Sequence, residues 1–240
     1  MTLRFAIPLL ALSLTGLPDA AAQNCDGWWA IGDPAARYRP AMVTDTGRGR
    51  VVLHGGISDS YSSVHAQNVS TETWEFDGQR WHFRTLSGPP VRRSTAMAYD
   101  ASRGVTVLQG GILRSSTGWT MFGAPTTETW EWDGSNWTQR NVPGAPAISG
   151  HLMAYDSVNQ LVLAYVPLTQ ALWTYDGVEW RQVPRQATWP ALASVAVMAF
   201  DEHRGVLVLA YPNQPTWEWN GESWTQGAIA PSNAGLVGSY

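Results

Sequence analysis

The chain has 240 residues, a formal net charge of −4 and a pI near 5.7. It therefore lacks the basic surface that nucleic-acid binding requires, and we predict no nucleic-acid partner. All 15 basic residues are Arg, which excludes the Schiff-base and P-loop chemistry that depends on Lys. The 14 Trp are many for this length.

The N-terminus has the pattern of a secretory signal peptide, which we assign to residues 1–22. Arg4 supplies a positive charge, an apolar run covers 5–17, and Ala20-Ala21-Ala22 forms a small-residue cleavage site. The apolar run is too short to span a bilayer and no later segment replaces it, so we predict a secreted or periplasmic protein without a transmembrane anchor after signal removal. Cys25 is the single cysteine, and we interpret it as a lone thiol because a disulfide would need a second chain.

Four times along the chain, a short apolar segment ends in Asp and is followed by a turn and a second apolar segment. Short apolar and β-branched runs bounded by Asp and Gly are typical of β-strands. First strands are predicted at 41–45, 96–100, 152–156 and 197–201. Second strands are predicted at 50–54, 105–109, 161–165 and 206–211.

Each of these pairs is followed by an aromatic strand, a tight turn with Gly, and a Trp seven residues after the first Trp. The four copies lie at 74–81, 130–137, 173–180 and 217–224. Gly accepts the positive φ of a tight hairpin turn, so each copy predicts two further strands. Alternation along a strand places Trp130 and Trp132 on one face and Glu131 on the other. Each unit therefore holds four strands, and its rings pack between neighbouring sheets.

The units differ in length between the second and third strands. From the last Asp of the first strand to the first Trp is 29 residues in unit one (45 to 74) and 30 in unit two (100 to 130), against 17 in unit three (156 to 173) and 16 in unit four (201 to 217). The additional residues form two long loops, 57–71 and 112–127. We expect these loops to be neighbours, because equivalent loops of adjacent units leave on the same face.

The two long loops carry the candidate binding residues. The first loop offers polar groups and the second an apolar cluster, a combination that suits a sugar or a peptide. The candidates are Asp59, Tyr61, His65, Gln67, Asn68, Arg114, Trp119, Met121 and Phe122. The alternative is that the loops pack on each other and cap a small ring.

The repeating pattern resembles the Kelch repeat, the unit of Kelch-type β-propellers, over about residues 26 to 226. Besides the aromatic third strand and the Trp that opens the fourth, the residues that carry the resemblance are Gly55-Gly56, Gly110-Gly111, Arg39 and Arg92-Arg93. Units three and four depart from it, because Ala164-Tyr165 and Ala210-Tyr211 stand where the Gly pair belongs.

The resemblance implies an all-β fold: a Kelch-type β-propeller or partial propeller of four four-stranded units within residues 23–226. We interpret Asp26-Gly27-Trp28-Trp29 as a surplus N-terminal strand and residues 227–240 as a loose C-terminal tail. Kelch propellers usually have more blades than four. Three interpretations stay open: a small ring, an array left open or closed by oligomerisation, and a truncated relative of a larger propeller.

The sequence contains no recognised catalytic or metal-binding motif, and we predict no cofactor and no metal site. The copper chemistry of galactose oxidase, a Kelch-type enzyme, is disfavoured because it needs a Cys–Tyr cross-link and the single Cys lies in the terminal fragment. Candidates for a site near the propeller axis are His54, Arg93 and His151. For the two His we favour ordinary hydrogen-bonded positions at strand ends.

Glu72 and Glu128 precede the third strand in the two units with long loops. They are either a pair of carboxylates for acid–base work or, as we favour, structural residues at the strand entry.

We therefore expect a secreted or periplasmic Kelch-repeat module that binds a protein or carbohydrate partner through loops 57–71 and 112–127. The alternative is an enzyme acting on a carbohydrate near the propeller axis, as the resemblance to Kelch-type periplasmic sialic acid mutarotases implies. A third interpretation is architectural, with the surplus strand closing an oligomer.

Overall fold

The computed structural model describes residues 33–58, 70–113, 123–191, 196–212 and 214–229. All of them belong to one compact unit, Gly32–Tyr240. They form strands and turns, and none of them lies in a helix long and apolar enough to cross a membrane. The stretches predicted as signal peptide and surplus strand lie outside the described residues.

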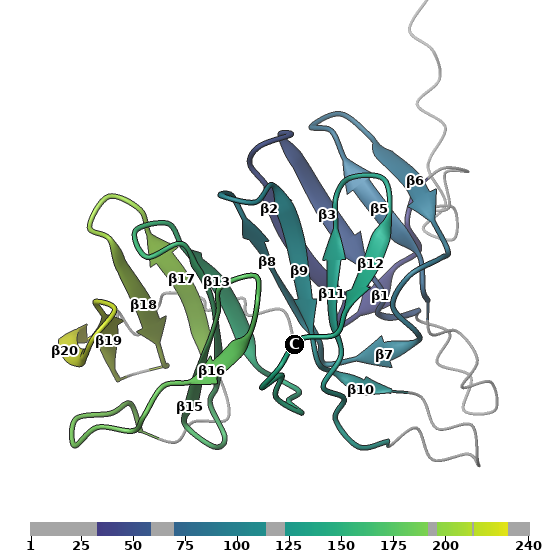
Figure 1. Cartoon of the computed structure of the whole chain (residues 1–240). Coiled ribbons are helices and arrows are strands. Elements are labelled where there is room, and N and C mark those ends of the chain that lie inside the picture. The colour runs from purple at the N-terminus through teal and green to yellow at the C-terminus, as the bar shows by residue number, and fades with distance from the viewer. Residues whose placement is uncertain (1–32, 59–69, 114–122, 192–195, 213, 230–240) are drawn as a thin grey trace, which may run out of the picture. The chain divides into compact units, whose positions relative to one another are not determined.

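Four antiparallel sheets of four strands each make up most of the described chain (Figure 1). Sheet 1 consists of β2 (Ala41–Asp45), β3 (Arg50–His54), β5 (Thr73–Phe76) and β6 (Trp81–Thr85). Sheet 2 consists of β8 (Ala96–Asp100), β9 (Val105–Gln109), β11 (Thr129–Trp132) and β12 (Trp137–Arg140). Sheet 3 consists of β13 (Leu152–Asp156), β14 (Leu161–Val166), β15 (Ala171–Tyr175) and β16 (Trp180–Gln182). Sheet 4 consists of β17 (Val197–Asp201), β18 (Val206–Ala210), β19 (Pro215–Trp219) and β20 (Trp224–Ile229).

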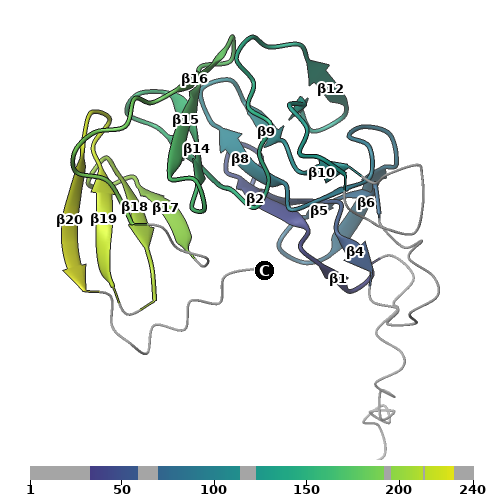
Figure 2. The same ribbon diagram turned by 90° about the horizontal axis from the view of Figure 1, so that it is seen from below.

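Within every sheet the strands pair in chain order, which confirms the predicted four-stranded unit. The predicted first and second strands agree with the observed ones to within one residue. β20 continues to Ile229, which pairs with Pro215, so strand pairing reaches into the segment predicted as the tail. The first strands β2, β8, β13 and β17 contact one another in turn, so the sheets succeed each other in chain order (Figure 2).

Two short ribbons supplement the four sheets at the places where the long loops begin. β1 (Arg37–Tyr38) pairs with β4 (Ile57–Ser58), and β7 (Arg92–Arg93) pairs with β10 (Ile112–Leu113). These strands were not predicted, because two residues are too few to show a periodic pattern.

An Asp at the end of each first strand shapes the turn that follows it. Asp45 Oδ1 accepts the backbone N–H of Arg48 at 3.0 Å, and Asp45 Oδ2 accepts Nε of the same Arg at 2.7 Å. The equivalent pairs in the other sheets are Asp100–Arg103, Asp201–Arg204 and, with an amide in place of the guanidinium, Asp156–Asn159. A short side chain that caps backbone N–H groups in this way favours a turn over a longer strand.

The two faces of each sheet carry different side chains. On one face, which we call the ring face, an aromatic residue of the third strand packs on the Trp of the fourth with ring centroids 5.0 to 5.6 Å apart. The four ring pairs are Phe76–Trp81, Trp132–Trp137, Tyr175–Trp180 and Trp219–Trp224. The opposite face is called the carboxylate face, because in sheets 1, 2 and 4 the third strand presents a Glu there, at positions 75, 131 and 218.

The ring face of sheet 2 packs on the carboxylate face of sheet 1 through hydrogen bonds. Trp132 Nε1 donates to Glu75 Oε1 at 2.9 Å, and Trp137 Nε1 donates to Thr73 Oγ1 at 2.8 Å. Glu75 is 1% exposed, and it also receives Arg48 Nη1 and Arg84 Nε, each at 2.7 Å. A buried carboxylate is tolerated only when such partners compensate its lost hydration.

The same contacts join sheet 3 to sheet 2. Tyr175 OH donates to Glu131 Oε1 at 2.9 Å, and Trp180 Nε1 donates to Thr129 Oγ1 at 3.0 Å. Burial, with the nearby charge of Glu131, raises the pKa of Tyr175, so its hydroxyl stays protonated and donates. Arg103 Nη1 lies 2.5 Å from Glu131 Oε1 and completes the cluster.

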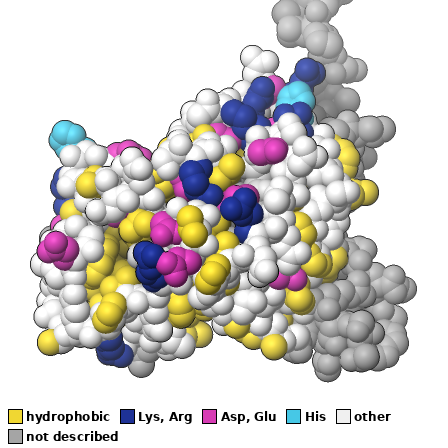
Figure 3. Space-filling model, viewed as in Figure 1, with side chains coloured by type: hydrophobic (Ala, Val, Ile, Leu, Met, Phe, Trp, Pro, Cys, Tyr) yellow, Lys and Arg dark blue, Asp and Glu magenta, His cyan; other side chains and the backbone are white. Residues whose placement is uncertain are grey.

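The turn glycines of the second hairpins complete these junctions. Gly134 has φ of 97°, and a Cβ there would lie 2.5 Å from Arg48 Nη1 of the preceding sheet. Gly177 stands in the same relation to Arg103, with Nε 2.8 Å from the added Cβ. Gly therefore serves two needs at this position, the positive φ and the close approach of an Arg. On the face seen in Figure 3, basic and acidic side chains of the described residues lie next to one another.

Glu75→Gln should destabilise the fold far more than Glu218→Gln. The first change removes a buried counter-charge that two guanidinium groups share, so that Arg48 keeps Asp45 alone and Arg84 loses its ion pair, and we expect a loss of about 2 kcal/mol or more. Glu218 is partly exposed with a single Arg partner, so its loss should cost less than about 1 kcal/mol. Urea unfolding of dilute protein measures both values, and equal losses would contradict the proposed role of the buried carboxylate.

Candidate functional site

A buried Arg fixes the base of the first long loop. Arg37 Nε donates to the carbonyl of Ala35 at 2.9 Å, and Nη1 donates to the carbonyl of Gly55 at 3.0 Å. Nη2 pairs with Glu72 Oε2 at 2.9 Å, and the same oxygen accepts Trp74 Nε1 at 2.9 Å. Burial alone would raise the pKa of Glu72, but the hydrogen bonds from Arg37 and Trp74 outweigh it and lower that pKa.

The second long loop has a base of the same design. Arg92 donates to the carbonyls of Pro90 and Gly110 and forms an ion pair with Glu128, which also accepts Trp130 Nε1 at 2.8 Å. The Arg92 side chain is fully buried. We call each set a loop clamp, comprising Arg37 with Glu72 and Arg92 with Glu128. The favoured interpretation of the two Glu as structural residues at the strand entry agrees with these contacts.

Arg37 was not predicted from the sequence, whose resemblance to the Kelch repeat pointed to Arg39 instead. Arg39 has a φ of 50° and takes no part in the clamp contacts, which belong to Arg37. A signal was present, because Arg37 precedes Gly55 by 18 residues and Arg92 precedes Gly110 by the same number. The nine candidate binding residues between 59 and 122 all lie outside the described residues.

His54, a candidate for the axis, is buried inside sheet 1. It is 1% exposed, its Nδ1 lies 3.0 Å from Thr73 Oγ1, and its ring packs edge-on against Trp137 at 5.2 Å. Burial, with the positive charges of Arg92 and Arg37, lowers the pKa of His54 to about 3. The ring is therefore neutral at physiological pH and belongs to the junction of sheets 1 and 2.

His151 and Arg93, the other two axial candidates, occupy different surroundings. His151 is 5% exposed, neither ring nitrogen has a hydrogen-bond partner in the described part of the chain, and burial lowers its pKa to about 3. Arg93 is half-buried in β7, in register with Ile112. His151 thus departs from the hydrogen-bonded position that we favoured for it.

The two buried His residues predict an acid-sensitive fold. Each has a folded-state pKa of about 3 against an ordinary value of 6.5, so the unfolded chain binds more protons between these pH values and stability falls as the pH falls. The slope approaches about 1.4 kcal/mol per pH unit for each His. His151→Phe should flatten the slope of unfolding free energy between pH 7 and pH 5, and the exposed His203→Phe is the control for a His-to-Phe change at the surface. If the slope in His151→Phe equals that of the wild type, His151 is not a buried, neutral group that contributes to the acid sensitivity.

The junction between sheets 3 and 4 departs from the other two. Leu172 and Thr174 stand where sheets 1 and 2 have Thr and Glu, and Asn159 stands where they have Arg. The donors of sheet 4 consequently lose their acceptors. Trp224 Nε1 is buried with no hydrogen-bond partner among the described residues.

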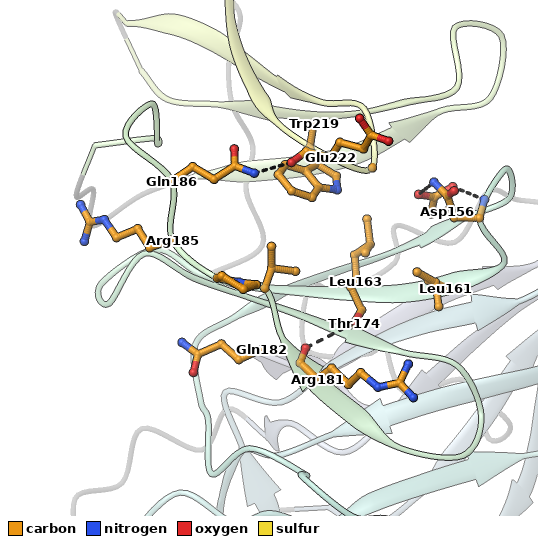
Figure 4. A pocket seen from close by; sticks show the side chains of 14 residues that line it. Asp156, Leu161, Leu163, Thr174, Arg181, Gln182, Arg185, Gln186, Trp219 and Glu222 are labelled. Atoms are coloured by element: carbon orange, nitrogen blue, oxygen red, sulfur yellow. Dashed lines mark hydrogen bonds between the residues drawn. The ribbon is translucent and has the colours of Figure 1, made fainter.

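A cavity of about 460 Å³ opens at this junction. Figure 4 shows Trp219 of sheet 4 on one side and Leu161 and Leu163 of sheet 3 on the other. Thr174 and Asn159 belong to its lining. Because these side chains are shorter than the Glu and Arg at the other junctions, the volume that an ion pair fills elsewhere is left open here.

Restoring the missing ion pair should close the cavity. In Asn159→Arg/Thr174→Glu the two new side chains can pair with each other and with Trp219, and we expect the double variant to gain about 1 kcal/mol. Each single variant lacks the opposite charge that the double variant supplies, with Asp156 beside position 159 and Arg181 opposite position 174 as the remaining partners, so neither should gain stability. A thermodynamic cycle measured by denaturant unfolding should therefore give a coupling of at least about 0.5 kcal/mol, and additive single effects would contradict the explanation.

No group of three or more His, Cys, Asp or Glu side chains is placed to hold a metal ion within the described ranges. The repeated four-stranded sheets, with rings packed between them, define the class of the protein as all-β and β-propeller-like. No protein-family model matches the chain, and no curated protein matches it in sequence.

Two solved structures show the same architecture. The chain is similar to YjhT with a TM-score of 0.61 and 12% identity, covering 84% of this chain and 68% of that one. It is also similar to a fungal alcohol oxidase of the AA5 family in complex with copper, with a TM-score of 0.51 and 15% identity, covering 80% of this chain and 41% of the oxidase. At these identities the similarity concerns the fold alone.

Proposed function

We propose that this protein is a secreted or periplasmic Kelch-type binding module that holds a protein or carbohydrate partner with loops 57–71 and 112–127. The observation that supports the proposal is the pair of loop clamps. At the base of each loop, a buried Arg donates hydrogen bonds to two backbone carbonyls and to a Glu. In the described chain this arrangement accompanies the two long connections, whereas sheets 3 and 4 have short ones.

The clamps suit recognition for a thermodynamic reason. Burying a guanidinium costs several kcal/mol of hydration, which only well-placed partners offset. A fixed loop base reduces the conformational entropy that a loop loses when it binds, so a buried clamp under a long loop favours affinity. The same arrangement under two adjacent loops supports a shared binding surface.

The alternative, a carbohydrate-acting enzyme with its site near the axis, gains no support from the two candidate His residues. His54 and His151 are buried and neutral, with pKa values of about 3, and a general acid or base works best with a pKa near the working pH. We therefore favour binding without chemistry.

The test is to shorten both loops to the length of the connections in sheets 3 and 4 while keeping both clamps. We expect wild-type protein to retain ligands on glycan and peptide arrays, and the trimmed variant to lose at least tenfold in affinity, which is about 1.4 kcal/mol. A control variant carries Gly/Ser sequences of the original lengths, and it separates loop chemistry from loop length.

Circular dichroism of the trimmed variant verifies that the four sheets are retained. Undiminished binding by a folded, trimmed variant would overturn the proposal. Turnover of a sugar by the wild-type protein, lost in His54→Gln or His151→Gln, would favour the enzyme instead.

A further inference from the structure

Sheet 4 carries an Asp, an Arg and a Glu of the set that sheets 1 and 2 use to hold the next sheet, although Gly227 stands where those sheets have a second Arg. The three residues are Asp201, Arg204 and Glu218, with Arg204 Nε 2.7 Å from Asp201 and Nη1 2.7 Å from Glu218. These three side chains are more exposed than their counterparts. Side-chain exposure is 33% for Asp201 and 27% for Glu218, against 2% for Asp45 and 1% for Glu75 in sheet 1.

The exposed Glu218 also has fewer donors than its buried counterparts. Glu75 receives two Arg residues of its own sheet and a Trp N–H of sheet 2. Glu131 has Arg103 and Arg140 as ionic partners and accepts the hydroxyl of Tyr175. In the described part of the chain, Arg204 alone pairs with Glu218. The carboxylate face of sheet 4 therefore shares its Asp, Arg and Glu with the two covered faces, but no sheet of the described chain lies on it.

Sheet 1 presents the other half of the same junction. Its ring pair, Phe76 and Trp81, has centroids 5.3 Å apart like the pairs of the other sheets, yet both rings are only half-buried. The ring pair of sheet 4, by comparison, is 3% exposed at Trp219 and 2% at Trp224. The turn glycine, Gly78, has φ of 94° and open space around it, whereas Gly134 and Gly177 lie against an Arg of the preceding sheet.

We propose that the carboxylate face of sheet 4 docks the ring face of sheet 1 from a second copy of this chain. The two uncovered surfaces are the two halves of one junction, which the chain itself forms between sheets 1 and 2 and between sheets 2 and 3. By that geometry the turn of Gly78 lies over Arg204 of the other copy, and the rings of Phe76 and Trp81 cover Glu218. A surface with this combination of rings, turn and spacing is present in the chain itself, so a second copy is the occupant with matching chemistry.

The contact is heterologous, because it joins two different surfaces, and each copy keeps one face for a further neighbour. Phe76 has no N–H to donate, unlike Trp132 at the equivalent position in sheet 2. The contact is consequently weaker than an internal junction, and association depends on protein concentration. This inference is independent of the proposed function, since it uses neither of the long loops.

The experiment measures mass in solution by analytical ultracentrifugation over a range of concentrations. Wild-type protein should associate reversibly as concentration rises. Glu218→Arg, which places two cations on the exposed face, should abolish association, and so should Trp81→Ala on the ring face. Gly78→Asn is a second ring-face variant, because a Cβ at this position has nothing within 4 Å in its own chain, whereas the Asn side chain would collide with Arg204 of the other copy. Glu179→Arg, a charge reversal at a partly exposed Glu in the turn between β15 and β16, is the matched control and should associate like the wild type.

Mixing the variants gives the sharper result. Glu218→Arg retains an intact ring face, and Gly78→Asn retains an intact carboxylate face, so the two should form a one-to-one complex although neither associates alone. A wild-type protein that stays monomeric at all concentrations would overturn the proposal. Association that survives in Glu218→Arg, or a mixture of the two variants that fails to pair, would overturn it as well.

Discussion

The structure depends on a carboxylate that is buried between sheets rather than within one. Glu75 and Glu131 each receive Arg side chains from their own sheet and a ring N–H or O–H from the next. A buried charge of this kind is stable only when every partner is in place, so it fixes the spacing and the register of adjacent sheets. The aromatic rings supply the buried area, and the carboxylates determine that the ring face of one sheet packs on the carboxylate face of the preceding sheet.

Much of the fold could be predicted from the sequence. Short strands with alternating burial and Gly-containing turns depend on neighbours in the chain, so their positions follow from local pattern, and the four units agree with the observed sheets. The junctions could not be predicted in the same way. Trp132 and Glu75 are 57 residues apart, and the sequence around either residue does not predict the hydrogen bond between them. The alternation along the strand predicted that Trp130 and Glu131 lie on different faces, but it did not predict which sheet packs on each face.

The candidate site was predictable only in part. The two long loops stand out by their length, and Glu72 and Glu128 by their equal positions, so the loop bases could be located from the sequence. Arg37 was missed because the stretch around it forms a two-residue strand whose pairing is invisible locally. The cavity between sheets 3 and 4 arises from an exchange of Arg for Asn and of Glu for Thr. Asn and Thr are ordinary polar residues for a strand or turn at a protein surface. They leave a cavity here only because another sheet packs on the same face.

The departure of sheet 3 from the shared design has a consequence for how such a chain can grow. A duplicated copy of the second unit, placed directly after itself, would present a ring face to Glu131 and a fresh carboxylate face to Tyr175, so both new boundaries would be chemically matched. The same copy placed between units three and four would set its rings against Thr174, which offers no carboxylate. The surface chemistry of this chain therefore favours an added unit in its first half and disfavours one at the boundary between its last two units.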